Sequence, residues 1–208
     1  MIKQKIFTYK FNKNTNASNY FVNESNYNAF NGLITNNNSN SLLIGPKKSG
    51  KSFLGNIWLN KNNAIELKQN FENVIEHKKN VLIDEFLLFD QENIFHIINN
   101  CNLHNLKILI ISNKTINEIN FKYKDLSSRL KTFNNFEINQ PNDEMLVSIL
   151  TKLLIDKQFI INSNDIFEYI LRRVDRSYKG IHDIVDKLDI LSLEKKRQLT
   201  IPLIKEIL

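Results

Sequence analysis

Residues 45–52, with the sequence GPKKSGKS, bring two glycines and three lysines together in one short stretch. Gly45 and the Gly50-Lys51-Ser52 triplet have the spacing of a phosphate-binding loop, in which backbone N–H groups surround the phosphates of a nucleotide at the start of a helix. Lys51 would reach the outer phosphates as a point charge, and the Ser52 hydroxyl would supply an oxygen ligand for Mg²⁺. The stretch therefore predicts binding of ADP or ATP with Mg²⁺. The expected nucleotide contacts in this stretch are Gly45, Pro46, Lys47, Lys48, Ser49, Gly50, Lys51, Ser52 and Phe53.

The residues on either side of the loop support this interpretation. Because the loop pattern contains free positions, it also occurs by chance in basic turns that bind no nucleotide, and the flanking residues decide between the two interpretations. The mechanism requires a short apolar strand before the loop and an amphipathic helix after it. The chain has Leu42-Leu43-Ile44 before the loop and apolar side chains at 53, 54, 57 and 58 after it.

Polar residues follow two further apolar stretches. In VLIDEF (81–86), Asp84 is expected to hold magnesium through water, and Glu85 to orient or activate the attacking water. The alternative is a strand that ends in solvated acids. Asn113, at the end of ILIIS (108–112), is a candidate for sensing the γ-phosphate or placing the water, although asparagine also suits an ordinary turn.

Arg129 lies beside two serines in KDLSSRLKTF (124–133). An arginine that reaches the phosphates of a neighbouring subunit stabilises the negative charge that develops in the transition state, and this effect is worth several powers of ten. The residues alone leave this role and an ordinary surface arginine equally open.

The hydrophobic pattern predicts the elements that must position these residues. Strands are expected at 41–44, about 64–67, 80–84, 107–112 and about 133–138, and helices at about 51–60, 69–78, 90–104 and 123–131. Strands that are unbroken apolar runs, such as 108–111, belong in a parallel sheet covered on both faces. The expected fold class is thus a three-layer α/β domain. The asparagine-rich stretch 35–41 is interpreted as a polar loop.

From Pro141 onward the predicted strands stop. Three apolar-periodic helices follow, at about 141–156, 163–175 and 179–195, and a short last helix begins near 200–202 with Pro202 in its first turn. The predicted organisation is an extended segment at 1–17, a nucleotide-binding α/β domain at 18–140 and a small all-helical lid at 141–208.

Composition restricts the remaining function classes. Hydrophobic residues make up 42% and charged residues 24% of the 208, as in ordinary globular proteins, and the net charge of +6 favours polyanionic partners. Cys101 is the single cysteine, which excludes an intrachain disulfide, and it is expected to be a small buried side chain. The four histidines have no metal-site spacing. No secretory signal or membrane-length apolar stretch is present, so a cytoplasmic protein without membrane contact is expected.

Taken in order, the phosphate loop, IDE, the polar strand end, SSRL and the helical region resemble an AAA+ ATPase. Within that class the chain resembles the group of the replication initiator DnaA and its shorter relative Hda. YFVNESNYNAF (20–30) is similar to the segment that walls the adenine pocket in this group, DLSSRL (125–130) to its arginine-finger box, and QLTIPLIKEIL (198–208) to the end of Hda-type proteins.

The resemblance implies further site residues. Adenine would lie against Tyr20, Phe21 and Val22. Lys179 occupies the position where the group places a second sensor arginine; lysine keeps the charge but loses the planar two-pronged geometry, so hydrolysis by this chain's own site is expected to be weak. Lys48 stands where relatives often have glycine, which should not prevent the loop from surrounding phosphate.

The resemblance also implies a role: a nucleotide-bound regulator that works with the DNA-loaded sliding clamp and promotes hydrolysis of the ATP held by DnaA, with Arg129 as the donated charge. Gln4, Phe7 and Tyr9 in MIKQKIFTYKF resemble the clamp-binding peptide of Hda-like proteins. A DnaA-like role is less expected because no DNA-binding helix-turn-helix follows residue 208.

Two other roles stay open. One is an adaptor whose ADP is purely structural, so that Arg129 only docks against a partner. The other is an ATP-driven helicase loader or transposition helper of related fold. Self-association as a homodimer and weak DNA binding are compatible with each of these roles.

Overall fold

The computed structural model describes residues 19–35, 39–68, 74, 76–161, 163 and 165–208. Five parallel strands form one sheet in the order β2-β3-β4-β1-β5. The strands are β1 (Ser41–Ile44), β2 (Ile65–Glu66), β3 (Val81–Ile83), β4 (Ile108–Ser112) and β5 (Asn134–Glu137). In the central register Ile44 lies opposite Ser112 of β4 and Glu137 of β5, so the segments that follow these strands leave the same edge of the sheet.

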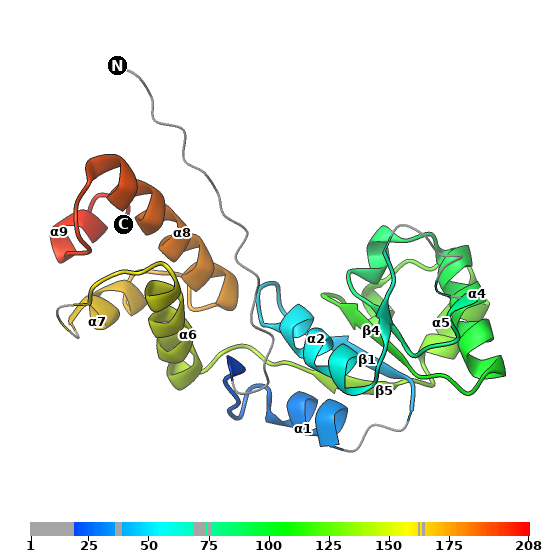
Figure 1. Cartoon of the computed structure of the whole chain (residues 1–208). Helices are drawn as coiled ribbons and strands as arrows, with labels where there is room; N and C mark the ends of the chain where they lie inside the picture. Colours follow the sequence, from blue (N-terminus) through cyan, green and yellow to red (C-terminus); the bar gives the residue numbers. More distant parts are fainter. Residues whose placement is uncertain (1–18, 36–38, 69–73, 75, 162, 164) are drawn as a thin grey trace, which may run out of the picture.

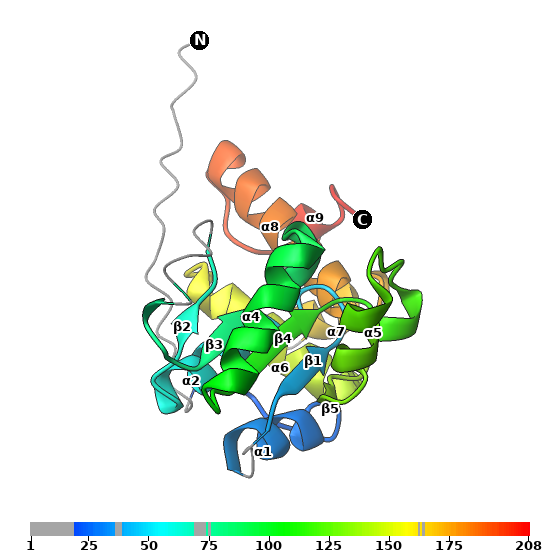
Figure 2. The same cartoon turned by 90° about the vertical axis from the view of Figure 1, so that its right-hand side faces the viewer.

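Successive side chains of the central strands point into two different cores, because side chains alternate between the faces of a sheet. Leu42 packs in the core under α4 (Gln91–Leu103) and α5 (Lys124–Leu130). Leu43 packs in the core under α1 (Tyr27–Thr35) and α2 (Lys51–Lys61). Figure 2 shows α4 and α5 in front of the sheet. This three-layer arrangement confirms the predicted α/β fold class.

The remaining helices form a separate group with its own apolar core. They are α6 (Asp143–Asp156), α7 (Asp165–Leu171), α8 (Tyr178–Lys195) and α9 (Ile201–Ile204). Side-chain caps at Asn142, Ser177 and Thr200 satisfy backbone N–H groups at the starts of α6, α8 and α9. Figure 1 shows this group at one end of the molecule and α4 and α5 at the other end.

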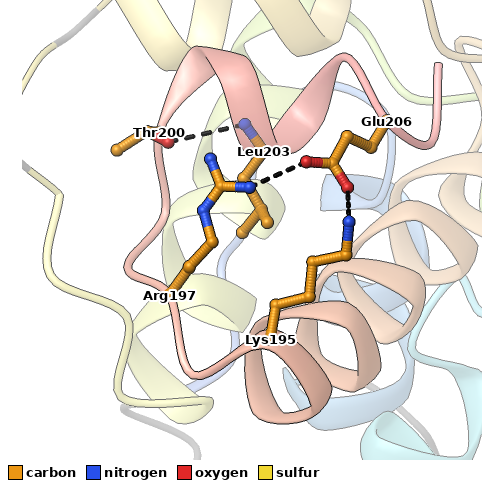
Figure 3. A network of polar contacts seen from close by, with 5 residues as sticks. All are labelled: Lys195, Arg197, Thr200, Leu203 and Glu206. Atoms are coloured by element: carbon orange, nitrogen blue, oxygen red, sulfur yellow. Dashed lines mark hydrogen bonds and ion pairs between the residues drawn. The ribbon is translucent and has the colours of Figure 1, made fainter.

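A polar network fastens the end of α8 to α9 (Figure 3). The Glu206 carboxylate pairs with Lys195 and, at 2.8 Å, with the Arg197 guanidinium. The Thr200 hydroxyl accepts a hydrogen bond from the Leu203 N–H at 3.4 Å. The segment that resembles the end of Hda-type proteins therefore folds back on α8.

Several elements differ from the sequence expectations. Helix α1 was not predicted, because asparagines interrupt its apolar positions and only Ala29 and Leu33 are buried. The helix expected at 163–175 is shorter, since α7 ends at Leu171 and the chain turns so that Ser177 can cap α8. Most of the helix expected at 69–78 lies outside the described residues. Short 3-10 helices η2 (Phe86–Leu88) and η3 (Ile116–Glu118) were also not predicted.

The structure bears on two features considered from composition: the environment of Cys101 and the presence of helices long enough to span a membrane. Cys101 on α4 is buried, and burial raises the pKa of its thiol to about 12, which keeps it in the unreactive protonated form. Within the described ranges, no helix has the length and apolarity needed to cross a membrane.

Candidate nucleotide-binding site

The phosphate loop joins the buried strand β1 to α2. Its last residue before the helix, Gly50, has a φ of 87°, a left-handed conformation that glycine adopts without strain. The loop closes through hydrogen bonds from the Gly45 N–H to the Ser112 carbonyl and from the Ser49 N–H to the Pro46 carbonyl, both at 3.3 Å. The first N–H groups of α2 have no partner within the helix, and its dipole favours an anion at this end. The local geometry fits a bound phosphate.

Lys51 is the first residue of α2 and folds back over the loop. Its Nζ donates to the carbonyl oxygens of Gly45 at 2.8 Å and Pro46 at 2.5 Å. Burial lowers the pKa of Lys51, and the negative charges of Asp84 and Glu85 partly oppose that change. The ammonium group is therefore held at the loop, close enough to both carboxylates to feel their charge. Ser52, the next residue, is exposed in the first turn of the helix.

Asp84, Glu85 and Asn113 come from the two strands beside the loop. Asp84 and Glu85 directly follow β3 and Asn113 directly follows β4, and the sheet order places β4 between β3 and β1. Glu85 is exposed with a φ of 49°, and its N–H donates to Asp84 Oδ1 at 2.8 Å. The chain thus turns sharply after Asp84, and both carboxylates remain near enough to Lys51 to oppose the lowering of its pKa by burial.

Asn113 is exposed beyond the last residue of β4. The turn that presents it is closed by Ser112, whose hydroxyl accepts from the Lys114 N–H at 2.9 Å and donates to the Lys114 carbonyl at 2.7 Å. Sequence reasoning did not identify Ser112. The feature that could have identified Ser112 is that it is a polar residue at the end of an otherwise apolar strand.

No group of three or more His, Cys, Asp or Glu side chains within the described part of the chain could hold a metal ion. Mg²⁺ is commonly bound by one or two protein oxygens together with nucleotide phosphates. Ser52 and Asp84 are oxygen donors of that kind beside the loop. These residues fit a magnesium ion that arrives with its nucleotide.

An aromatic stack covers the lid side of the phosphate loop. The Tyr20 ring lies between Phe30 of α1 and Phe53 of α2, with centroid distances of 5.7 Å to each and interplanar angles of 13° and 22°. Phe21 is 41% exposed and Val22 is half-buried. Both faces of the Tyr20 ring are occupied within the chain, whereas Phe21 and Val22 have surface available.

Residues 19–26 also connect the α/β region to the helical region. Asn23 Nδ2 donates to Asn142 Oδ1 at 2.8 Å, and the hydroxyls of Ser25 and Tyr178 lie 3.2 Å apart. Tyr178 belongs to the same apolar core as α1 and α2. Sequence reasoning did not predict that Asn23 and Ser25 connect the two regions, because each partner is more than a hundred residues away.

Lys152 of α6 makes a further contact between the two regions. Its Nζ donates to the Asn19 carbonyl at 2.8 Å and lies 5.2 Å from the centroid of the Phe53 ring, in a cation–π contact. The stack beside the phosphate loop is therefore tied to the helical region as well. Nothing in the sequence around Lys152 distinguishes it from a surface lysine.

Lys179 is the second residue of α8, next to the buried Tyr178. Its side chain is exposed, and its Nζ lies 3.9 Å from Asp183 Oδ2. Because Tyr178 is fixed against the α/β core, the backbone of Lys179 is held beside the segment that carries Tyr20. Its long side chain can turn toward a ligand without disturbing any core contact.

Arg129 lies away from these residues. It is near the end of α5, just before β5 begins at Asn134, and Asn134 lies opposite Ser41, the first residue of β1. The phosphate loop follows the other end of β1, about 13 Å along the strand. The Arg129 guanidinium packs over the Phe95 ring of α4, 4.8 Å from its centroid. The structure thus brings Tyr20, Lys51, Asp84 and Glu85 together at the loop and places Arg129 away from it. Gln4, Phe7 and Tyr9 lie outside the described residues.

Comparisons with known proteins agree with this geometry. Residues 143–208 match the family described as "Hda, lid domain". The structure superposes on domain III of DnaA from Thermotoga maritima with a TM-score of 0.77, covering 95% of this chain and 96% of that one at 16% identity. The chain as a whole has the fold of DnaA domain III. The helical region therefore corresponds to an Hda lid, and the α/β region has the AAA+ fold.

Two further comparisons extend this result. AMPPCP-bound DnaA from Aquifex aeolicus superposes with a TM-score of 0.64, 18% identity and coverage of 85% of this chain and 65% of that one. The DnaA protein of Buchnera aphidicola subsp. Cinara cedri is 26% identical over 153 residues, which are 71% of this chain and 34% of that protein. The chain spans between about a third and a half of the length of the curated relatives that it matches.

Proposed function

We propose that the chain binds ADP or ATP together with Mg²⁺ at the phosphate loop. Backbone N–H groups of residues 45–52 would hold the phosphates, and Lys51 would exchange its two carbonyl acceptors for phosphate oxygens. Ser52 and Asp84 would hold the magnesium ion, which when bound neutralises part of the phosphate charge. Adenine would lie against Phe21, Val22 and the edge of the Tyr20 ring. The orphaned hydroxyl of Ser49, which makes no hydrogen bond among the described residues, supports a ligand at this loop.

We further propose that the chain is an Hda-like regulator of replication initiation. In this role it acts with the DNA-loaded sliding clamp on ATP-bound DnaA and promotes hydrolysis of that ATP, which restrains initiation. The match of residues 143–208 to the Hda lid family supports this proposal. So does the net charge of +6, which suits an assembly on DNA and a weak direct contact with it. The cytoplasm, where DnaA acts on the chromosome, is the proposed location.

The observation that carries the proposal is the position of Arg129. The parallel register separates Arg129 from the chain's own phosphate loop by the length of β1, so this guanidinium is unavailable to its own nucleotide. It is half-buried over Phe95 and still accessible. Its helix, α5, lies at the end of the molecule opposite the lid (Figure 1). A guanidinium fixed at an outer edge is suited to reach the phosphates of a neighbouring molecule, whether DnaA or a second copy of this chain.

The chain's own catalytic groups are less well arranged. Lys179 would replace the two-pronged guanidinium of a second sensor, and the Glu85 side chain is exposed to solvent. Glu85 and Asn113 would still flank the γ-phosphate and could place a water molecule there. We therefore expect weak hydrolysis by this chain itself. These features favour the second candidate function, a non-hydrolysing ADP-bound adaptor that docks through Arg129.

The test measures ATP hydrolysis by DnaA with the clamp on DNA, in the presence of this chain or of its Arg129→Ala variant. We expect the variant to lose at least about 100-fold in stimulation, because the arginine acts on charge that develops only in the transition state. Lys131→Ala, an exposed change in the following turn, is the matched control and should stimulate fully. The affinity of the variant for ADP should equal that of the parent.

Two outcomes decide between the candidates. Full stimulation by the Arg129→Ala variant would reject the role of this arginine in hydrolysis. If the parent chain does not stimulate hydrolysis, and the Arg129→Ala variant no longer forms a complex with DnaA in sedimentation, the chain is the adaptor.

A further inference from the structure

The hydroxyl of Tyr20 is buried and makes no hydrogen bond to any described residue. The amide of Asn26 lies nearby and makes two other hydrogen bonds: its Nδ2 donates to the Phe21 carbonyl at 2.8 Å and its Oδ1 accepts from the Asn23 N–H at 2.9 Å. Burial raises the pKa of Tyr20; proximity to Asn26 reduces that effect and the Tyr178 phenol adds to it. The hydroxyl is thus a proton donor that lacks an acceptor.

The ring of Tyr20 cannot turn freely to find another partner. Phe30 and Phe53 stack on its two faces, and Phe53 is held in turn by Lys152. The rigid ring points the hydroxyl in one direction. A donor that is fixed in this way is suited to bind a ligand that arrives at the same place.

That place is the phosphate loop. A Cβ atom added at Gly50 would lie 3.2 Å from Tyr20 Cε2 and 3.8 Å from the Tyr20 hydroxyl oxygen. Gly50 is the residue that leads from the loop into α2, where backbone N–H groups are directed at phosphate. The phenol therefore lies beside the phosphate loop and close to Tyr178.

We propose that the Tyr20 hydroxyl binds the diphosphate of the nucleotide, donating a hydrogen bond to a non-bridging phosphate oxygen. A buried hydroxyl without an acceptor destabilises the chain relative to phenylalanine, which would fill the same aromatic stack. A phosphate oxygen beside Gly50 supplies the acceptor, and hydrogen bonds to charged groups are the stronger class. This inference rests on the nucleotide binding proposed above and assigns the diphosphate contact to a residue outside the loop.

The test compares the parent chain with Tyr20→Phe by calorimetric titration with ADP and Mg²⁺. The variant should bind ADP about tenfold more weakly or worse, the expected effect of losing a hydrogen bond to a charged group. Without nucleotide its melting temperature should equal or exceed that of the parent, because an unsatisfied buried group has been removed. Tyr27→Phe on α1, where the side chain is 56% exposed, is the matched control and should bind like the parent.

A second measurement identifies the atom contacted. The ³¹P spectrum of saturating ADP bound to the Tyr20→Phe variant should differ from that bound to the parent in the resonance of the contacted phosphate. Unchanged ³¹P resonances, or an affinity within about twofold of the parent, would overturn the assignment. A lower melting temperature without nucleotide would also overturn it, since the hydroxyl would then have a structural partner.

Lys51→Ala separates this inference from the proposed function. If Lys51→Ala abolishes ADP binding and Tyr20→Phe leaves it intact, the phosphate loop is functional and only the role of Tyr20 is wrong. If neither variant changes ADP binding, the nucleotide site itself lies elsewhere and both proposals fail.

Discussion

Lys48 shows how the phosphate loop imposes its backbone geometry on an unfavourable residue. It has a φ of 67°, in the left-handed region where a side chain costs about 1 kcal/mol relative to glycine. Glycine would adopt the same backbone conformation at this position without strain. The flanking strand and helix fix both ends of the loop, so the loop keeps its shape with lysine in place.

The effect of a substitution at position 48 on the free energy of unfolding should therefore depend on the backbone preference of the new residue and not on its charge. Lys48→Gly should change the free energy of unfolding by less than about 0.5 kcal/mol, because relief of strain offsets the greater entropy of the unfolded chain. Lys48→Val should destabilise by about 1 kcal/mol or more, because β-branched residues are strained in this region.

Urea unfolding at neutral pH measures these differences. Lys47→Val is the control, since Lys47 is equally exposed and has no positive φ. Equal destabilisation by valine at positions 47 and 48 would show that the backbone at Lys48 is not strained.

At the scale of elements, the lid is fastened at both ends of α8. Tyr178 at its start contacts Ser25 and the core of the α/β region, and Lys195 at its end pairs with Glu206 beyond α9 (Figure 3). The hydrogen bond from Lys195 lowers the pKa of Glu206 most; desolvation opposes it, and the hydrogen bond from Arg197 and the charges of both residues lower the pKa further. The last turn of the chain is thus held by a charge that depends on pH.

The sign of that dependence follows from the lowered pKa. A carboxylate with a lower pKa in the folded state stabilises the fold above its unfolded pKa, and this contribution is lost as the pH falls through the folded value. We expect Glu206→Gln to be less stable than the parent at pH 7. The difference should begin to shrink as the pH falls toward the usual glutamate pKa of about 4.3 and below it.

Thermal melting between pH 7 and pH 4 measures the difference. Glu194→Gln, at an exposed position of α8, should not reproduce it. A difference between Glu206→Gln and the parent that grows as the pH is lowered would contradict the assignment of the ion pairs.

At the scale of the whole molecule, the proposed nucleotide site lies at the junction of the two regions. The segment 19–26 contacts the phosphate loop through Tyr20 and the lid through Asn23 and Ser25. Arg129 lies at the opposite end, so ligand binding and the proposed action on a partner use separate surfaces. Residues 1–18 precede this junction, and their proposed role is to bind the clamp.

The clamp-binding prediction is tested with Gln4→Ala combined with Phe7→Ala. The glutamine would bond at the rim of a pocket on the clamp and the apolar side chains, Tyr9 included, would fill its groove, so that a few anchors carry most of the affinity. The double variant should lose retention on immobilised clamp while its affinity for ADP stays the same. Thr8→Ala is the control for a change in the same peptide. Retention of the double variant equal to that of the parent would place the tether elsewhere or remove the proposed role.

The sequence was sufficient to predict the elements whose patterns are local. Unbroken apolar runs such as 108–111 gave the buried parallel strands, and the spacing from Gly45 to Ser52 gave the phosphate loop, because these signals depend only on neighbouring residues. Helix α1 was not predicted from the sequence. Its composition is rich in asparagine, and the helix is stabilised by burial of Ala29 and Leu33 in the core. Tertiary packing overrides local propensity in such cases.

What only the tertiary structure decided is which residues meet. The sequence named Tyr20, Lys51, Asp84, Asn113 and Lys179, and it could not place any of them relative to the others. The sheet order brings the ends of β3, β4 and β1 together and puts Arg129 at the opposite edge. The contacts of Lys152 with Phe53 and of Ser25 with Tyr178 join residues far apart along the chain, which local patterns do not encode. The sequence by itself determined the chemical groups available, and long-range packing determined which of them lie together at the phosphate loop.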